Sequence, residues 1–428
     1  MEDPAASNMK WTVWQKNAFR FFFLFLASTS FTAYNVLITI FSSSWETHSR
    51  FLSVLRQPIA WLDNHFYHFG FIPDKHQTFF GDGPFGWAFM LTLFFLSVAG
   101  TIIWAIADRK RNNYNRLHFW FRSYLAYYLF LTLVIYAVEK IIPVQMPYPN
   151  VTDLLTRVGD QDGFTMVWNF IGSNSAYSIF TGICELTAAI LVLFRRTRVF
   201  GSLFMVTVLT NVVCLNVFYN IMVKLLCLQL LVTALFLLAP YVPALFRFFY
   251  KLQPVSLSES EYRFSTPWKK WTVVLLLLAP AWVSFAIVKK SMDTYKQNIS
   301  NRENQKLYNA EIFMRGNDTL PPLLSDTLRW KRFVFTAFRK EKMVVIYNMQ
   351  DAADYYDYDT DSIHQTITLH DNPDTLSWHV FKYGYPLPGK YQLSGTWKGQ
   401  PVTVILNAVS IDSLFLLPGE KTTWVHNF

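Results

Sequence analysis

The chain has 428 residues, of which 52% are hydrophobic and 18% aromatic, but only 16% are charged. This composition is too apolar for an ordinary soluble protein. The net charge of +9 does not indicate a nucleic-acid-binding protein, because Lys and Arg lie in short clusters between apolar runs, with no basic stripe of interleaved aromatic residues. The first 290 residues hold the apolar runs and the last 120 alternate in polarity, so we expect two regions of different class.

Seven windows approach the roughly 20 apolar residues that cross a bilayer. They are 17–41, 85–107, 119–143, 176–194, 199–218, 223–240 and 271–288. The first lacks a good cleavage site, so we expect a retained anchor rather than a signal peptide. Basic residues cluster at 108–116, 195–198 and 244–270, on alternate sides of successive spans. The positive-inside rule therefore predicts a cytoplasmic N-terminus and places everything after Val288 outside.

The first outer loop contains Asp63, His65, His68 and His76. A His-x-x-His pair can supply two metal ligands from one helical face. The flanking acids of known zinc motifs are missing, and the aromatic density of this loop favours a helix lying at the membrane interface. We therefore predict no metal site and keep the three histidines as weak candidates.

An acidic residue, Glu185, lies near the middle of the fourth predicted span. An ionised carboxylate there costs several kcal/mol unless it is paired. Other polar residues lie at or near the outer ends of spans three, five and six: Tyr136, Glu139, Lys140, Asn211, Asn216 and Lys224. Together these residues predict a polar cavity that opens outward, with Glu185 as its floor.

Helix rise places Glu185 about 12–15 Å deeper than Lys140 and Lys224. We predict that it pairs with one of these lysines, directly, through water or through a polar chain that includes Asn211. Such a pair can also specify helix packing and nothing more. Arg122, at the cytoplasmic end of the third span, is expected to snorkel to lipid headgroups.

The segment 289–310 is polar and free of glycine, which is typical of a helical stalk. From about 310, short runs of β-branched and aromatic residues alternate with turn signals such as DNPD and PLPGK. They predict seven or eight antiparallel strands in a small barrel or sandwich. The acidic run 351–362 lacks the Gly and the final Glu of a calcium loop, so we interpret it as a solvated hairpin or strand edge. The three cysteines fall inside predicted spans and are interpreted as small buried hydrophobes.

The stretches YAVEKII, with Lys140, and GICELTAAILVLFRRT, with Glu185, Arg195 and Arg196, resemble the DoxX family of four-helix membrane bundles. The whole chain is similar to a longer Bacteroidetes-type variant with extra helices before the bundle and an exported β domain after it. One departure is that the surroundings of Tyr136 and Glu139 replace the family's usual Gly near the Lys. The predicted regions are 1–118, N-terminal helices with an outer loop; 119–249, a DoxX-like four-helix bundle; 250–290, the last transmembrane helix; 291–309, the stalk; and 310–428, the exported β domain.

The resemblance implies a subunit of a membrane complex, with a quinone as the implied cofactor and a link to redox chemistry. No P-loop, GxGxxG, GxSxG or HExxH motif occurs, so the sequence names no catalytic residue. Three functions stay open: a quinone-binding redox subunit, a transporter or lipid-handling protein, and an envelope scaffold without a ligand. The expected partners are membrane lipid and a membrane-complex protein, and not nucleic acid. The expected location is the bacterial inner membrane, with the C-terminal domain in the periplasm.

Overall fold

The computed structural model describes residues 10–41, 45–72, 81–255, 269–338, 341–370 and 378–411. The chain divides into two compact units. One comprises Met1–Ile141 and Ile179–Val288, and the other comprises Ile142–Ser178 and Lys289–Phe428.

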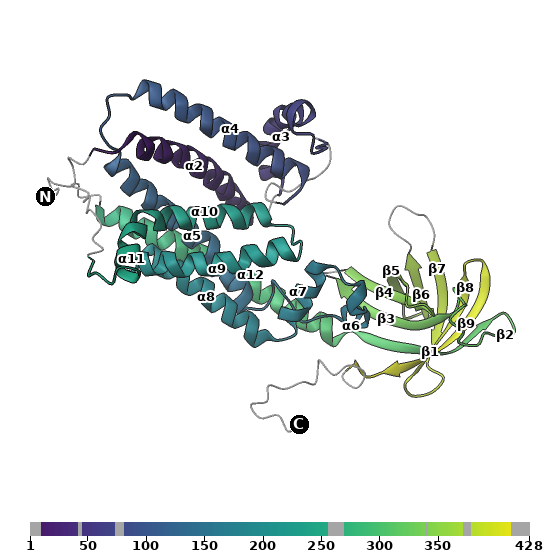
Figure 1. Cartoon of the computed structure of the whole chain (residues 1–428). Coiled ribbons are helices and arrows are strands. Elements are labelled where there is room, and N and C mark those ends of the chain that lie inside the picture. Colours follow the sequence, from purple (N-terminus) through teal and green to yellow (C-terminus); the bar gives the residue numbers. More distant parts are fainter. Residues whose placement is uncertain are drawn as a thin grey trace. The chain divides into compact units, whose positions relative to one another are not determined.

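The first unit is helical (Figure 1). Its helices are α2 (Val13–Phe41), α3 (Trp45–Leu62), α4 (Pro84–Ala107), α5 (Asn115–Ile141), most of α8 (Ser175–Leu193), α9 (Arg198–Phe218), α10 (Lys224–Leu238), α11 (Val242–Phe249) and the start of α12 (Lys269–Glu303). A π-helical turn, η1 (Asp63–Tyr67), follows α3, and a 3-10 turn, η3 (Ala239–Tyr241), joins α10 to α11.

Five stretches of helix in the described residues are long and apolar enough to cross a membrane. They are Pro84–Ala107, Asn115–Ile141, Ser175–Leu193, Arg198–Phe218 and Lys224–Phe249. These helices make the chain a multi-pass membrane protein and match five of the predicted spans. The other two predicted spans, 17–41 and 271–288, lie in α2 and α12, whose side chains are described only in part. They stay predictions.

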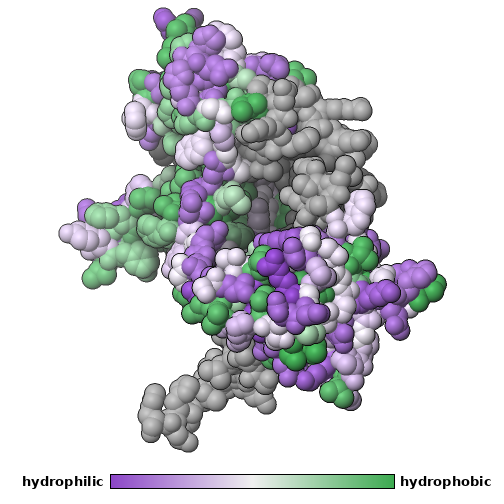
Figure 2. Space-filling view, turned by 90° about the vertical axis from the view of Figure 1, so that its right-hand side faces the viewer, coloured by the Kyte–Doolittle hydropathy of each residue, from purple (hydrophilic) through white to green (hydrophobic). Residues whose placement is uncertain are grey.

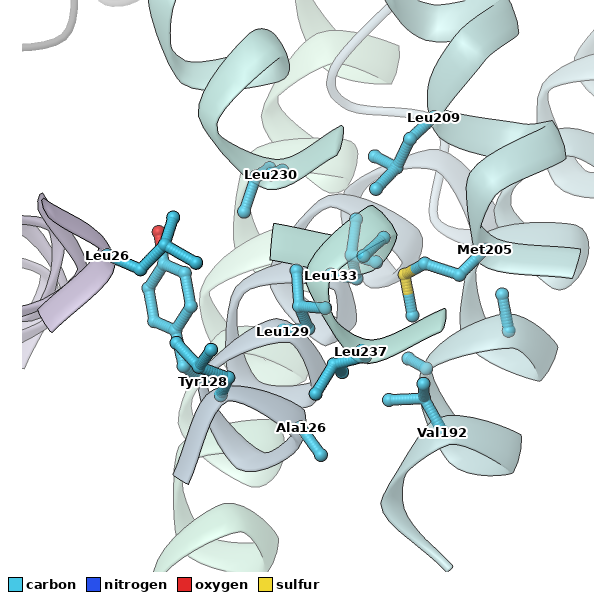
Figure 3. Close-up of a cluster of buried hydrophobic side chains, with 14 of the residues drawn as sticks. Leu26, Ala126, Tyr128, Leu129, Leu133, Val192, Met205, Leu209, Leu230 and Leu237 are labelled. Carbon is cyan, nitrogen blue, oxygen red and sulfur yellow. The ribbon is translucent and has the colours of Figure 1, made fainter. Parts of the chain in front are cut away.

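Helix α5 is the centre of the bundle, since 72% of its apolar window is buried, against 11% for α4. Its buried side chains pack with side chains from four other helices, and Figure 3 shows part of this cluster. Those labelled there are Leu26 of α2; Ala126, Tyr128, Leu129 and Leu133 of α5; Val192 of α8; Met205 and Leu209 of α9; and Leu230 and Leu237 of α10. Because α4 has so little buried surface, its apolar side chains are suited to contact with lipid.

The second unit contains the β domain, α6 (Val151–Leu155), η2 (Val158–Asp160), α7 (Gly163–Gly172) and the C-terminal part of α12. Its strands are β1 (Lys306–Arg315), β2 (Asp318–Thr319), β3 (Trp330–Phe338), β4 (Glu341–Asn348), β5 (Ala353–Asp361), β6 (Thr366–His370), β7 (Trp378–Gly384), β8 (Lys390–Trp397) and β9 (Gln400–Val409). From β3 onward each strand pairs antiparallel with the next, β3 pairs with β1, and β1 also pairs with β9. These pairings close an eight-stranded barrel, with β2 as a short addition to β1.

Side chains fill the interior of this barrel. The predicted alternation in β8 and β9 is confirmed, because Tyr391 and Leu393 pair with Leu406 and Val404 and all four are buried. The β domain is thus one of the two predicted forms, a barrel rather than a sandwich, because β1 and β9 pair along their lengths. In the space-filling view of Figure 2, hydrophilic residues on the visible surface are interspersed with scattered hydrophobic ones.

Helix α6 is attached to the barrel wall. Val151 of α6 packs with Leu307 of β1, Val334 of β3 and Val345 of β4 on the outside of the sheet. The acidic run 351–362 begins in the turn between β4 and β5 and then forms β5, a strand that pairs with both β4 and β6 and has mostly exposed carboxylates. The polar segment predicted as a helical stalk is helical to Glu303, as the last part of α12.

Candidate functional site

A buried ion pair joins α5 and α8. Lys140, in the last turn of α5, donates a hydrogen bond from Nζ to Oε1 of Glu185 on α8. Lys140 is 8% exposed and Glu185 is 3% exposed. The predicted pairing is therefore confirmed, with Lys140 as the partner and as a direct contact. The predicted difference in depth is wrong, because the middle of α8 lies against the last turn of α5.

A glycine permits this contact. A Cβ at Gly182 would lie 2.8 Å from the carbonyl oxygen of Ala137 and 2.9 Å from Cβ of Lys140. Gly182 and Glu185 are three residues apart, so they share one face of α8. The absent side chain at Gly182 lets the two helices approach closely enough for Glu185 to meet Lys140.

The second carboxylate oxygen of Glu185 is the free acceptor of the site. Oε2 is buried and has no hydrogen-bond partner among the described residues. A buried carboxylate oxygen without a donor is costly. Oε2 can therefore take a hydrogen bond from the hydroxyl or amide of a small molecule, or a proton. Cys227 of α10 is also buried and lies close enough to interact electrostatically with both Lys140 and Glu185. Sequence reasoning treated it only as a hydrophobe.

Lys224 does not join this pair. Its Nζ lies 3.0 Å from Oδ2 of Asp82, and Oδ1 of Asp82 accepts the backbone N–H of Leu225 at 3.1 Å. Asp82 thus caps the N-terminus of α10, where a carboxylate is favoured by the helix dipole. Sequence reasoning missed Asp82, because it precedes α4 and lies 142 residues from Lys224.

Of the remaining predicted site residues, Tyr136 of α5 lies close enough to interact electrostatically with both Glu185 and Cys227. Asn216 is buried and donates to the carbonyl oxygen of Val212 in its own helix at 2.8 Å. Asn211 is exposed, and Tyr136 and Glu139 are half-buried. Of the predicted polar set, the structure brings Lys140 and Glu185 into direct contact, and this contact does not involve a polar chain through Asn211.

The prediction that Arg122 snorkels to lipid headgroups is wrong. Arg122 is 7% exposed and donates to the carbonyl oxygen of Leu237 at 3.2 Å. Its guanidinium carbon lies 4.8 Å from the centre of the Tyr241 ring. The unsatisfied carbonyl groups at the C-terminus of α10 are a better acceptor for this arginine than the membrane surface, because the helix dipole favours a cation there.

Other basic residues gather at the same end of the bundle as Arg122. Arg20 of α2 donates to the Tyr114 hydroxyl at 3.0 Å and to the carbonyl oxygen of Asp108 at 3.2 Å. Arg195, after α8, lies over the ring of Phe119 in α5 at 4.5 Å. The basic segments after α4 and α8 therefore meet at one end of the bundle, and Lys140 lies at the other end of α5.

His65 and His68, the weak metal candidates that the structure describes, do not belong to a metal-binding cluster. His65 is exposed, with Nδ1 2.8 Å from the carbonyl oxygen of Trp61, and His68 is exposed in a left-handed turn with φ +58°. His76 lies outside the described residues. Asp63 is buried and accepts the backbone N–H groups of Phe69 and Phe71, so its carboxylate holds the loop. In the described part of the chain, no group of three or more His, Cys, Asp or Glu side chains could hold a metal ion.

Comparison with known proteins gives one distant, partial relative. The chain is 32% identical to the uncharacterized protein YwoB of Bacillus subtilis (strain 168) over 118 residues, which are 28% of this chain and 72% of YwoB. The chain belongs to the family of YwoB. The name of YwoB states no activity. No family model and no solved structure matches the chain.

Proposed function

We propose that this relative of YwoB is a DoxX-like protein of the bacterial inner membrane with seven transmembrane helices, α2 and α12 being the first and last. Its N-terminus lies in the cytoplasm and its β barrel lies in the periplasm. It acts as a subunit of a membrane complex and binds the reduced form of a quinone beside Lys140 and Glu185. One observation carries the ligand site: Oε2 of Glu185 is buried without a hydrogen-bond partner among the described residues.

The orientation is supported by the basic end of the bundle. Arg20, Arg122 and Arg195 make their contacts at one end, and positively charged residues favour the cytoplasmic side of a membrane. A reporter fused after Phe428 that functions only outside the cytoplasm should therefore be active. Activity of a reporter that functions only in the cytoplasm would contradict this orientation.

The choice of ligand follows from the hydrogen-bonding groups of the pair. Lys140 is a donor, and the free oxygen of Glu185 is an acceptor. A quinol has two hydroxyl groups, so one can donate to Oε2 while the ring stays in the apolar bundle. An oxidised quinone has acceptors alone and would leave Oε2 unsatisfied. The resemblance to DoxX makes a quinol the first ligand to test, ahead of a lipid hydroxyl group.

Copurification tests this proposal. The intact protein, extracted in mild detergent, should retain quinone that mass spectrometry detects after denaturation. Glu185→Gln keeps the shape of the side chain but changes Oε1 or Oε2 into an amide donor, so the retained quinone should fall at least tenfold. Asp82→Asn alters a different ion pair of the helical unit, the one with Lys224, and should retain quinone normally. Retention of a phospholipid alone, lost in Glu185→Gln, would instead assign lipid handling.

A scaffold is the second candidate, and the burial of the pair favours it. A buried pair between two helices can fix how they pack without binding anything. In that case, Glu185→Gln should not change the bound molecules, and function in the cell should be lost only when the β domain is removed.

A further inference from the structure

One end of the β barrel contains a cavity of about 440 Å³, and all the residues that line it belong to the second unit. Six aromatic residues line it: Tyr308, Phe335, Tyr358, Tyr383, Tyr385 and Tyr391. They come from the start of β1, the ends of β3, β5 and β7, and the start of β8. Since neighbouring strands run antiparallel, these positions meet at one mouth of the barrel.

The cavity is a cup rather than a channel. Phe333 and Leu393, which follow deeper in β3 and β8, are fully buried in the barrel core. The lining ring of Tyr391 is 5% exposed. A ligand would therefore enter from the mouth and rest on a closed apolar floor, as in small barrels that hold one ligand.

The walls present ring faces and hydroxyl groups. Ring centres lie 5.3 Å apart for Tyr385 and Tyr391, and also for Phe335 and Tyr358. Burial raises the pKa of the Tyr308, Tyr358 and Tyr391 hydroxyls. These groups therefore stay protonated at neutral pH and can donate hydrogen bonds, while the ring faces can pack on a planar group or on the apolar face of a sugar ring.

The rim carries positive charge. Lys306 and Lys342 line the cavity, and no Asp or Glu is among the described residues that line it. Two other lysines of the barrel are paired, Lys331 with Asp351 and Lys390 with Glu311. Within the described part of the chain, Lys306 and Lys342 have no ion-pair partner. Two lysines in a cavity whose described lining includes no Asp or Glu favour a negatively charged ligand.

We propose that this tyrosine-lined cup binds a small anionic ring compound, with the ring against the tyrosines and the acidic group between Lys306 and Lys342. The volume fits a ligand of one or two rings, since pockets for small molecules begin near 300 Å³. The chemistry is shared by aromatic acids and by acidic sugars, and the experiment distinguishes them. The proposal is independent of the quinol site, because each site lies in a different unit.

The test uses the full-length protein in detergent and saturation-transfer NMR with four probes. They are 1-naphthoate and glucuronate, and their uncharged counterparts 1-naphthalenemethanol and glucose. We expect one of the two acids to bind at least tenfold more tightly than its uncharged counterpart. The acid that binds identifies the source: 1-naphthoate an aromatic acid, and glucuronate an acidic sugar. Equal binding of acid and counterpart, or no binding of any probe, would overturn the proposal.

Substitutions locate the binding. Tyr385 is 70% exposed and Lys342 is also exposed, so Tyr385→Ala and Lys342→Gln should not disturb folding. Each substitution should weaken the binding of the acidic probe about fivefold or more. The matched controls are Tyr355→Ala and Lys398→Gln, which alter exposed residues of the barrel outside the cup. Loss of binding in the controls but not in the cup variants would place the ligand elsewhere and refute the site.

Discussion

Gly182 of α8 packs against Lys140 of α5 so closely that an added Cβ would lie 2.9 Å from Cβ of Lys140. That distance is shorter than real Cβ contacts allow, and the backbone oxygen of Ala137 lies closer still at 2.8 Å. The crossing of α5 and α8 therefore depends on glycine at this position, and so does the meeting of Lys140 with Glu185.

Gly182→Ala should destabilise the helical unit by about 1–3 kcal/mol, the usual cost of forcing extra atoms into a packed contact. Gly100→Ala is the matched control, because the added Cβ would meet only the tip of the Leu24 side chain, and alanine favours the helix by about 1 kcal/mol. Unfolding in mixed detergent micelles measures both variants. Equal stabilities would show that α5 and α8 do not cross as closely as described.

The Lys140–Glu185 pair should behave as a coupled unit. Lys140→Met or Glu185→Leu alone leaves a buried charge unpaired and should cost about 3–5 kcal/mol. The double variant leaves no charge and should be more stable than either single variant. Unfolding in mixed detergent micelles measures the stabilities of the two single variants and of the double variant. If the losses in unfolding free energy of the two single variants simply add in the double variant, the two groups do not interact.

Asp351 should make the β domain sensitive to acid. Burial alone would raise the pKa of this carboxyl, but hydrogen bonds from Lys331 and Arg157 and the charge of Arg332 more than offset it, so the pKa lies below 3.8. A depressed pKa contributes stability that is complete above the unfolded pKa and is lost as the pH falls through the folded value. The barrel should therefore lose stability below about pH 4.

Asp351→Asn should remove this part of the pH dependence and cost about 1.5–3 kcal/mol at pH 7, which is the usual contribution of a hydrogen bond to a charged group. The control is Asp357→Asn, which changes an exposed carboxylate of β5. Near-ultraviolet circular dichroism of the barrel tryptophans during unfolding at pH 7 and pH 3 follows both. If the stability of Asp351→Asn depends on pH in the same way as that of the unmodified protein, Asp351 is not the source of the acid sensitivity.

Gly395 should be required for the pairing of β7 with β8. A Cβ there would lie 2.3 Å from the backbone oxygen of Val380, so Gly395→Ala must move a strand and should cost about 2–3 kcal/mol. Gly384, also in this strand pair, has nothing within 4 Å of an added Cβ, so Gly384→Ala should be nearly neutral. Thermal unfolding of the barrel compares them, and a neutral Gly395→Ala would refute the register.

The membrane helices and the strands could be predicted because both depend on local pattern. A span needs a fixed length of apolar residues, and a half-buried strand alternates, as at Val402 and Val404. Glu185 was recognisable because acids are rare in such spans. The sequence could not distinguish a barrel from a sandwich. The barrel closes only because β1 pairs with β9, and those two strands are far apart in the chain.

The partners of charged residues were harder to predict. Hydropathy does not show which helices cross, so the role of Gly182 was not visible. Lys224 was a predicted partner for Glu185, but it forms an ion pair with Asp82. Asp82 comes from a loop distant in sequence and also caps the N-terminus of the helix that contains Lys224. Arg122 looked peripheral because it lies near a helix end, yet the C-terminus of α10 buries it. In each case a long-range contact decided the outcome.

Infrared difference spectroscopy of quinol binding tests the proposed site most directly. Adding a soluble quinol, such as decylubiquinol, to the protein in detergent under reducing conditions should shift a carboxyl or carboxylate band, because the quinol hydroxyl is proposed to donate to Oε2 of Glu185. The shifted band should be absent in Glu185→Gln and unchanged in Asp82→Asn. A difference spectrum that is identical in the unmodified protein and in Glu185→Gln would show that Glu185 does not contact the ligand.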